Sequence, residues 1–307
     1  MKRYLRFGLR SLLIVMTLFC VWCAWLVRVL HHAEQQGEAV AWISKHHGWV
    51  KYDWELGKKS RLPDTKWVRD IFGDDCFQTV EKVGIGGKGI NDLTPLEKLP
   101  KLQGVYVYHA KVEDLTPVSK LQHLRWLAVV DAPIEDLTPL ANLEKLESLE
   151  CTMTRVDDLT PLAHLHNLGR LRITQSDVQD LTPVANLRKL TLLDVTANPV
   201  RDLSPLASLT RLKTLNLQVT QVRDLTPLRS LRRIECLGVA QTDVTDITPL
   251  AALINLRSLH TSYTEVRDFS PLTELPKLEQ IVVGSSQLAN AKLLTERTGV
   301  KVRLSGN

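Results

Sequence analysis

Hydrophobic residues recur along most of this chain in a fixed order and at a fixed spacing. The pentapeptide Asp-Leu-Thr-Pro-Leu, with conservative replacements, begins at residue 92 and returns every 22 residues for nine copies without an insertion. Between copies, apolar residues keep an LxxLxL spacing, as at Leu124, Leu127 and Val129. A period of this length is typical of a repeat protein in which each unit forms the same supersecondary structure.

Each repeat predicts one strand and one short helical turn. The LxL part alternates with period two, as expected for a strand buried on one face. The invariant Pro follows Thr or Ser, which predicts an N-cap hydroxyl with proline at the first helical position. We therefore expect an α or 3-10 turn to begin at each Pro, for example at Pro139, with Leu140 and Leu143 pointing inward. Because one unit cannot bury its own leucines, the units must stack into a continuous core.

An aspartate opens all nine copies of the pentapeptide. A ladder of metal sites would need several carboxylates converging on each ion, whereas each repeat supplies only one. Each aspartate precedes a helical turn, where backbone N–H groups lack partners, so we interpret the column as local capping. The column consists of Asp92, Asp114, Asp136, Asp158, Asp180, Asp202, Asp224, Asp246 and Asp268.

Over residues 80–288 the pattern DLTPLxxLxxLxxLxLxxTxV resembles the 22-residue leucine-rich repeats of internalins. The resemblance implies an α/β solenoid, a leucine-rich repeat horseshoe with a concave parallel β-sheet and short 3-10 or α turns on the convex side. It also implies protein recognition by the concave face. The chain departs from the family at its asparagine column, where hydroxyls can replace part of the hydrogen bonding. That column reads Ala110, Ala132, Thr154, Ser176, Asn198, Thr220, Thr242, Thr264 and Ser286.

Residues 11–27 contain no charge and are long enough to cross a bilayer. Trp22 and Trp25 lie near the C-terminal end of this run, where an interfacial aromatic belt is expected. More bases precede the run than follow it, which predicts a cytoplasmic N-terminus and repeats outside the cytoplasm. We expect one transmembrane helix, an uncleaved anchor that the membrane holds through residues 11–27. A cleaved signal peptide, which lacks a small-residue cleavage site here, and a buried soluble helix are the alternatives.

Six of the seven tryptophans precede residue 70, which indicates that a different structure caps the repeats. A solenoid exposes core at both ends, so covers are required there. We expect residues 1–30 to form the cytoplasmic tip and anchor, 31–79 the N-terminal cap, 80–286 the repeats and 287–307 the C-terminal cap. Within the caps we expect helices over 34–46, 64–72 and 287–297, and strands over 49–55 and 300–304, with Val80, Val83 and Ile85 in a degenerate first repeat strand.

The charge distribution, the cysteine spacing and the absence of catalytic motifs argue against nucleic-acid binding, metal binding and catalysis. The net charge of +5 comes from five bases in residues 1–30, and the remaining 34 Lys and Arg balance 34 Asp and Glu, so no nucleic-acid partner is expected. The five cysteines have neither disulfide-framework nor zinc spacing. The glycine-rich segment 84–89 lacks P-loop spacing, and no catalytic triad motif is present. We therefore expect no catalytic residue, no cofactor and no metal, and the protein is not predicted to be an enzyme.

A binding surface is predicted on the outward face of the strands. Residues 22 apart become neighbours on adjacent strands, which makes Tyr106 and Trp126 diagonal neighbours beside Tyr108 and His109. Tryptophan and tyrosine are enriched in binding hot spots, so we hypothesise a recognition patch at the N-terminal end of the concave face. Contact of these aromatics with the N-terminal cap, or chance exposure, is the alternative.

A charge ladder follows along the same row. Glu150, Arg172 and Asp194 alternate in sign across neighbouring strands, which suits either a partner or simple cross-strand support of the sheet. The function we predict is a non-enzymatic, membrane-anchored module that binds a protein or peptide through its concave face. The alternatives are a self-associating envelope scaffold and a regulatory subunit of an enzyme, the latter by resemblance to intracellular repeat proteins that bind phosphatases.

Overall fold

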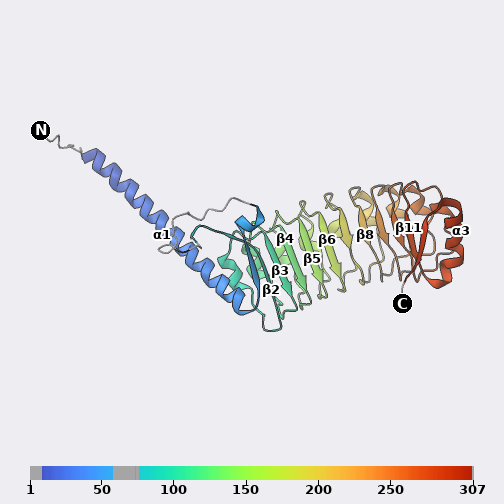
Figure 1. Cartoon of the computed structure of the whole chain (residues 1–307), viewed down its shortest axis with the longest axis horizontal. Helices are drawn as coiled ribbons and strands as arrows, with labels where there is room; N and C mark the ends of the chain where they lie inside the picture. The colour runs from blue at the N-terminus through green and yellow to red at the C-terminus, as the bar shows by residue number, and fades with distance from the viewer. Residues whose placement is uncertain (1–8, 58–72, 74–75, 306–307) are drawn as a thin grey trace.

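The chain folds into one long stack of strands with a helix projecting from its N-terminal end (Figure 1). This computed structural model describes residues 9–57, 73 and 76–305. In that part of the chain, twelve strands form one sheet whose spatial order is the order of the sequence. The first two strands pair antiparallel, and all later neighbours pair parallel. The strands are β1 (Trp49–Tyr52), β2 (Val80–Gly86), β3 (Gly104–Tyr108), β4 (Trp126–Val130), β5 (Ser148–Thr152), β6 (Arg170–Thr174), β7 (Leu192–Asp194), β8 (Thr214–Asn216), β9 (Cys236–Gly238), β10 (Ser258–His260), β11 (Gln280–Val283) and β12 (Lys301–Leu304).

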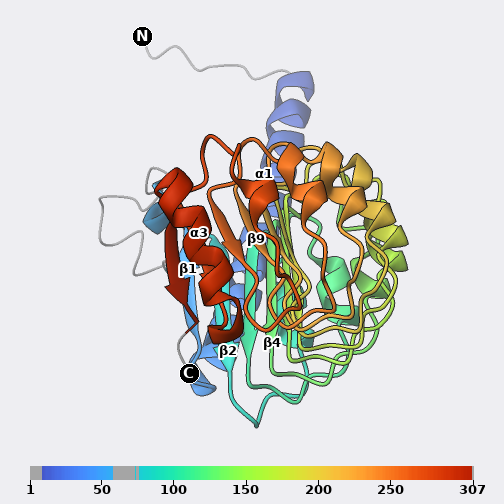
Figure 2. The ribbon, with the colours of Figure 1, turned by 90° about the vertical axis from the view of Figure 1, so that its right-hand side faces the viewer.

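A 3-10 turn follows each strand of the repeats, on the side of the stack opposite the sheet. Viewed along the stack, the turns line one side and the strands the other (Figure 2). This arrangement confirms the predicted leucine-rich repeat solenoid. The turns are η3 (Thr94–Lys98), η4 (Thr116–Lys120), η5 (Thr138–Leu140), η6 (Thr160–Leu162), η7 (Thr182–Val184), η8 (Ser204–Ser208), η9 (Thr226–Ser230), η10 (Thr248–Ala252) and η11 (Ser270–Leu272), with η1 (Asp53–Leu56) and η12 (Ser285–Gln287) in the end regions.

Leucine and valine side chains fill the space between each strand and its turn. In one repeat, Leu115 and Leu124 are 1% exposed and Leu121 is fully buried. Removing one such side chain from water stabilises the fold by about 1.5–3 kcal/mol. Neighbouring repeats cover one another, so a single core runs from Ala39 in the N-terminal helix to Val300 near the last strand.

The aspartate of each repeat caps the turn, and the hydroxyl does not. In all nine repeats the carboxylate Oδ1 accepts the backbone N–H of the Thr or Ser two residues later, at 2.7–2.8 Å. The predicted hydroxyl cap is therefore wrong: each turn begins at the Thr or Ser itself, one residue before Pro, and no side chain at the N-cap position caps it. The hydroxyl becomes a donor instead, as where Ser204 Oγ donates to Asp202 Oδ2 at 2.7 Å.

The asparagine column of the resemblance is largely replaced by hydroxyls that bond the backbone. Asn198 is 2% exposed and its Nδ2 donates to the carbonyls of Ile173 and Val195, while its Oδ1 accepts from Val178 N. Thr220, Thr242 and Thr264 each donate one hydrogen bond to the backbone carbonyl three residues earlier, as where Thr220 Oγ1 donates to the Leu217 carbonyl at 2.7 Å. In the last repeat, Ser286 was expected at the asparagine position, but Ser286 is exposed. The buried Gln287 makes the corresponding hydrogen bonds instead. Its Nε2 donates to Thr264 and its Oε1 accepts from Gly284 N.

The N-terminal segment forms one continuous helix, α1 (Leu9–Lys45), which contains both the apolar run of residues 11–27 and the cap helix expected over 34–46. Its last turns dock on the first repeat through Ala39 and Ile43, which are 1% and 0% exposed. The predicted strand over 49–55 is shorter, because the 3-10 turn η1 begins at Asp53. The helix expected over 64–72 lies outside the described residues.

The C-terminal end is closed by α3 (Leu288–Thr298) and by β12, which pairs parallel with β11. Ala291 and Leu294 of α3 are buried against the last repeat. Gly299 ends the helix with a φ of 75°, a left-handed conformation that glycine adopts without steric cost. The helix expected in this region is therefore present, shifted by one residue, and the expected strand is present but begins one residue later.

Candidate recognition surface on the concave sheet

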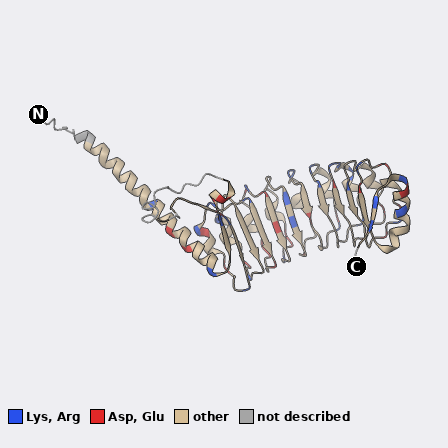
Figure 3. Ribbon diagram, viewed as in Figure 1, with Lys and Arg blue, Asp and Glu red and all other residues tan. Residues whose placement is uncertain are grey.

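The register of the sheet brings residues that are 22 apart into rows across the concave face. In the central row, Tyr106 pairs with Gly84 and Ala128, and Glu150 pairs with Arg172. Acidic β5 and basic β6 therefore lie side by side in the middle of the stack (Figure 3). All seven residues predicted for partner binding lie on this face or at its rim.

The first predicted aromatic, Tyr106, is partly covered by the N-terminal cap. The Trp49 ring of β1 reaches across Gly84 and lies 5.7 Å from the Tyr106 ring, centroid to centroid. A Cβ at Gly84 would come within 2.2 Å of the Trp49 indole nitrogen, so only glycine admits this contact. Burial raises the pKa of the Tyr106 hydroxyl. Tyr106 thus joins the cap to the repeats, which is the alternative that the sequence left open.

The second aromatic, Trp126, is paired with cations instead of with Tyr106. Lys82 of β2 extends across Gly104 and places its ammonium 4.2 Å from the Trp126 ring centroid. The guanidinium of Arg125 lies 5.3 Å from the same ring. Trp126 remains half-buried, at the edge of the sheet where each strand begins. The two aromatics are therefore held by different neighbours and do not form one stacked patch.

Tyr108 and His109 lie where β3 ends. Tyr108 is 38% exposed, and burial, followed by the Glu150 carboxylate, raises the pKa of its hydroxyl. His109 has a φ of 52° and its Nδ1 lies 2.9 Å from Asp131 Oδ2. Of the predicted patch, these two residues offer the more exposed side chains.

The charge ladder forms as predicted and is bonded internally. Arg172 lies 3.1 Å from a Glu150 carboxylate oxygen and 3.6 Å from an Asp194 carboxylate oxygen. The network continues to Asn216, whose Nδ2 is 3.5 Å from Asp194, and to Gln218, which donates to Asn216 at 2.7 Å. A partner that uses this row would meet a pre-ordered polar strip with alternating charge.

A row that the sequence reasoning did not single out stands just before the strands. It contains bases and amides and no acid in nine successive repeats. The 22-residue spacing makes this row visible in the sequence, but the row lies in the loops that precede the strands and not in the strands themselves. The row reads Lys101, His123, Lys145, Asn167, Lys189, Arg211, Arg233, Asn255 and Lys277.

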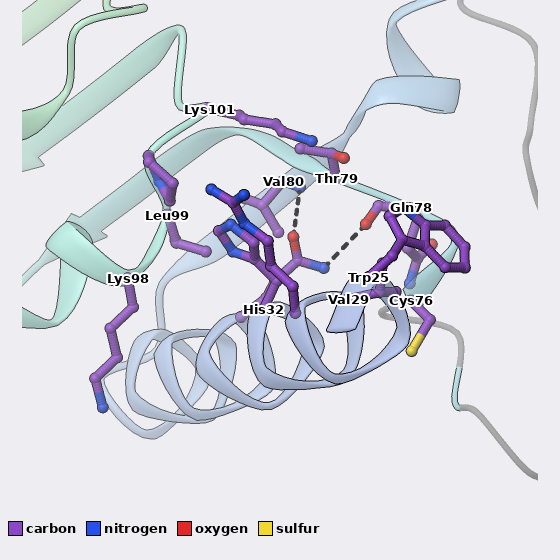
Figure 4. A pocket seen from close by; sticks show the side chains of 13 residues that line it. Trp25, Val29, His32, Cys76, Gln78, Thr79, Val80, Lys98, Leu99 and Lys101 are labelled. Atoms are coloured by element: carbon purple, nitrogen blue, oxygen red, sulfur yellow. Dashed lines mark hydrogen bonds between the residues drawn. The ribbon is translucent and has the colours of Figure 1, made fainter. Parts of the chain in front are cut away.

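A small cavity of about 200 Å³ lies between α1 and the first repeat (Figure 4). Gln36 crosses it, because its Nε2 donates to the Gln78 carbonyl and its Oε1 accepts from Val80 N. Lys98 bonds Glu38 on α1 and lowers the pKa of that carboxyl. These contacts fasten the helix to the solenoid. Within the described residues, no group of three or more His, Cys, Asp or Glu side chains could hold a metal ion.

Solved structures share this fold. The internalin InlF of Listeria monocytogenes superposes with a TM-score of 0.60 at 28% identity, covering 73% of this chain and 82% of its own. Internalin C2 of the same organism gives 0.50 at 26% identity over 66% of this chain and 80% of its own. The chain is internalin-like. No family profile matches the sequence, and no curated relative matches it at a significant level.

The internalin-like fold also extends to plant receptors. The leucine-rich repeat ectodomain of the membrane receptor kinase GASSHO1/SCHENGEN3 from Arabidopsis thaliana, solved in complex with CASPARIAN STRIP INTEGRITY FACTOR 2, superposes with a TM-score of 0.56. Its identity is 18%, and the match covers 65% of this chain and 26% of that ectodomain. At this identity the likeness concerns the fold alone.

Proposed function

We propose that this protein is a non-enzymatic, membrane-anchored recognition module whose concave sheet binds a protein or peptide outside the cytoplasm. The observation that carries the proposal is the exposed apolar N-terminal half of α1. The C-terminal turns of the same helix pack on the first repeat of the solenoid. An 18-residue apolar window of this helix has none of its residues buried within the protein. Such a surface requires cover, and its length and composition suit a bilayer.

The concave face supports the recognition part of the proposal. Parallel sheets are ordinarily covered on both faces, whereas here the helical turns cover only the convex side. The internalin-like fold adds to this support, since two solved internalins of Listeria superpose on 73% and 66% of the chain. The chemistry-bearing residues of the concave row are bonded to one another, which favours binding over catalysis.

The anchor and its orientation are tested by a topology reporter fused after Asn307. We expect activity from a reporter that works only outside the cytoplasm, together with a full-length chain that resists extraction from membranes by carbonate. A reporter active only in the cytoplasm would reject the proposed orientation. A shortened chain that washes from the membrane would point to a cleaved signal peptide.

The binding face is tested by photo-crosslinking in native membranes. A photoreactive residue at Asn216 or Gln218, both on the concave face, is expected to give a discrete crosslinked product. The matched controls are Arg188 and Arg229, which are exposed near the convex turns. Equal products from both pairs, or products from the convex pair alone, would contradict recognition by the sheet.

A further inference from the structure

We propose that a groove at the N-terminal ends of the strands binds an acidic peptide segment in extended conformation. This inference rests on the proposed function, because it names a class of partner for the same solenoid. The groove spans β4 to β9 and has a volume of about 650 Å³. It is bordered by Trp126, Arg170, Lys189, Arg211, Lys213 and Arg233.

The groove is strongly cationic. It has five basic side chains along its walls and one carboxylate, Glu147. That carboxylate is already engaged, since Arg125 Nε donates to it at 2.9 Å. Within the described part of the chain, Arg170, Arg211 and Arg233 take part in no ion pair or side-chain hydrogen bond, so their charges are uncompensated. This concentration stands out because the bases and acids of residues 31–307 balance.

The hollow arises where a row of ion pairs is interrupted. Immediately before the strands, Arg125 pairs with Glu147, and further along Lys213 pairs with Glu235 at 3.0 Å. The two positions between these pairs are Gly169 and Thr191. Neither can supply a carboxylate, and both are too small to fill the space between Glu147 and Lys213 in that row. The same two residues therefore create the room and leave the charge without an internal partner.

The dimensions suit a short extended chain. From β4 to β9 the groove crosses five strand spacings of roughly 4.8 Å, or about 24 Å in all. An extended peptide advances about 3.3 Å per residue, so about seven residues would fill it. The hollow is open to solvent, and its basic side chains lie on successive repeats along the stack, which favours a linear ligand over the flat surface of an anionic membrane.

Carboxylates fit this trough better than nucleic acid does. Proteins that bind single strands without regard to sequence stack successive bases on several aromatic rings. This groove has one aromatic, Trp126, and its ring already packs against the cations of Lys82 and Arg125. Arginine guanidinium groups bind carboxylates through two parallel hydrogen bonds, and three of the five bases are arginines.

Fluorescence anisotropy with the full chain in detergent micelles tests the proposal. The probe is a fluorescein-labelled heptaglutamate, with heptaglutamine, a heptathymidylate oligonucleotide and glycerophosphoglycerol, the water-soluble headgroup of phosphatidylglycerol, as comparison ligands. We expect heptaglutamate to bind more tightly than the other three and to weaken when NaCl rises from about 50 to 300 mM, because exposed charge pairs are screened by salt.

Variants locate the binding. The double substitution Arg170→Gln and Arg211→Gln is expected to weaken heptaglutamate about tenfold, which corresponds to about 1.4 kcal/mol. The control, Arg188→Gln with Arg229→Gln, removes the same charge from the convex side and should bind as wild type does. A circular dichroism melt confirms that both variants fold. Equal weakening in the control, or no measurable binding of heptaglutamate to wild type, overturns the inference.

The comparison ligands also test which class of partner the groove binds. Tighter binding of the oligonucleotide or of glycerophosphoglycerol would assign the groove to nucleic acid or to lipid headgroups and reject the peptide. A failure of the groove proposal can be distinguished from a failure of the proposed function. If crosslinking at Asn216 still gives its product while heptaglutamate does not bind, the concave face remains the recognition surface and only the groove is excluded.

Discussion

At the scale of single residues, the bend after each repeat strand requires a residue with positive φ. Residue types differ in how well they adopt this left-handed conformation. Eight residues spaced by 22 have φ between 52° and 58°, and none is glycine. Val219 is the least suited, because a β-branched side chain at positive φ is a steric outlier. The column consists of His109, Asp131, Met153, Gln175, Ala197, Val219, Gln241 and Tyr263.

Relief of this strain should stabilise the protein. Val219 is 46% exposed, so replacing it removes little buried surface. Val219→Asn is expected to raise the free energy of unfolding by about 1 kcal/mol, because asparagine adopts this conformation readily. Denaturant titration measures the change. Val219→Thr keeps the branch and should leave stability unchanged; an equal gain in that control would show that polarity, and not strain, is responsible.

The asparagine column offers a second test at this scale. Asn198 satisfies several buried backbone groups at once, whereas Thr220 bonds one carbonyl. Leaving a buried polar group without a partner costs about 1–3 kcal/mol, so we expect Asn198→Ala to destabilise by about 3 kcal/mol and Thr220→Ala by about 1 kcal/mol. Thermal melts rank the two. Equal losses would mean that threonine fully replaces asparagine in this solenoid.

At the scale of elements, the sequence predicted the strands and turns because burial repeats with them. Each LxL segment lies in a strand or crosses its end, and each Pro of the pentapeptide lies in a 3-10 turn, so the period of the apolar residues predicts the local structure. The identity of the cap could not be decided by type alone, because Asp and Thr both accept hydrogen bonds from backbone N–H groups. The structure shows that the aspartate is the cap, because its carboxylate reaches the backbone N–H two residues later.

The capping aspartates make the turns sensitive to acid. Hydrogen bonds from the Thr or Ser side chain and backbone lower the pKa of Asp158, Asp202 and other members of the column. A carboxyl whose pKa is lower in the folded state stabilises the fold above its unfolded pKa, about 3.9, and this contribution is lost as pH falls through the folded pKa. We therefore expect the melting temperature to fall steeply below about pH 4.

Asparagine substitution isolates this effect. Asp158→Asn with Asp202→Asn keeps an acceptor oxygen in each cap and removes the titration. The double variant should lose less of its melting temperature between about pH 4 and pH 2 than wild type does. Asp157→Asn with Asp177→Asn changes the charge equally without touching a cap. An identical flattening in that control would attribute the pH dependence to net charge.

The candidate site was less predictable than the elements, for a reason that Tyr106 and Trp126 illustrate. Their positions on the sheet followed from the repeat, but their contacts did not. Trp49 and Lys82 reach them across Gly84 and Gly104, from strands two positions away. Residues 31–79 have no period that would place Trp49 over the sheet. The basic groove required both the stacking of loops and the absence of a side chain at Gly169.

At the scale of the whole molecule, the linkage between helix and solenoid governs how the sheet is presented. The apolar run ends at residue 27, and Gln36 is the first buried side chain of α1. At about 1.5 Å per residue, only about 14 Å of helix separates the two points. No flexible linker intervenes, because α1 is continuous through this region.

Because α1 is continuous, the number of residues between its apolar run and its docked end sets the direction in which the concave face points. Each residue of an α-helix turns the chain by about 100°, so one residue inserted between Arg28 and Gln36 would swing the sheet by more than a quarter turn about the helix axis. Insertion of seven residues would nearly restore the direction while raising the solenoid by about 10 Å. The direction of the concave face and its distance from the apolar end of α1 are thus set together by the length of one short helical segment.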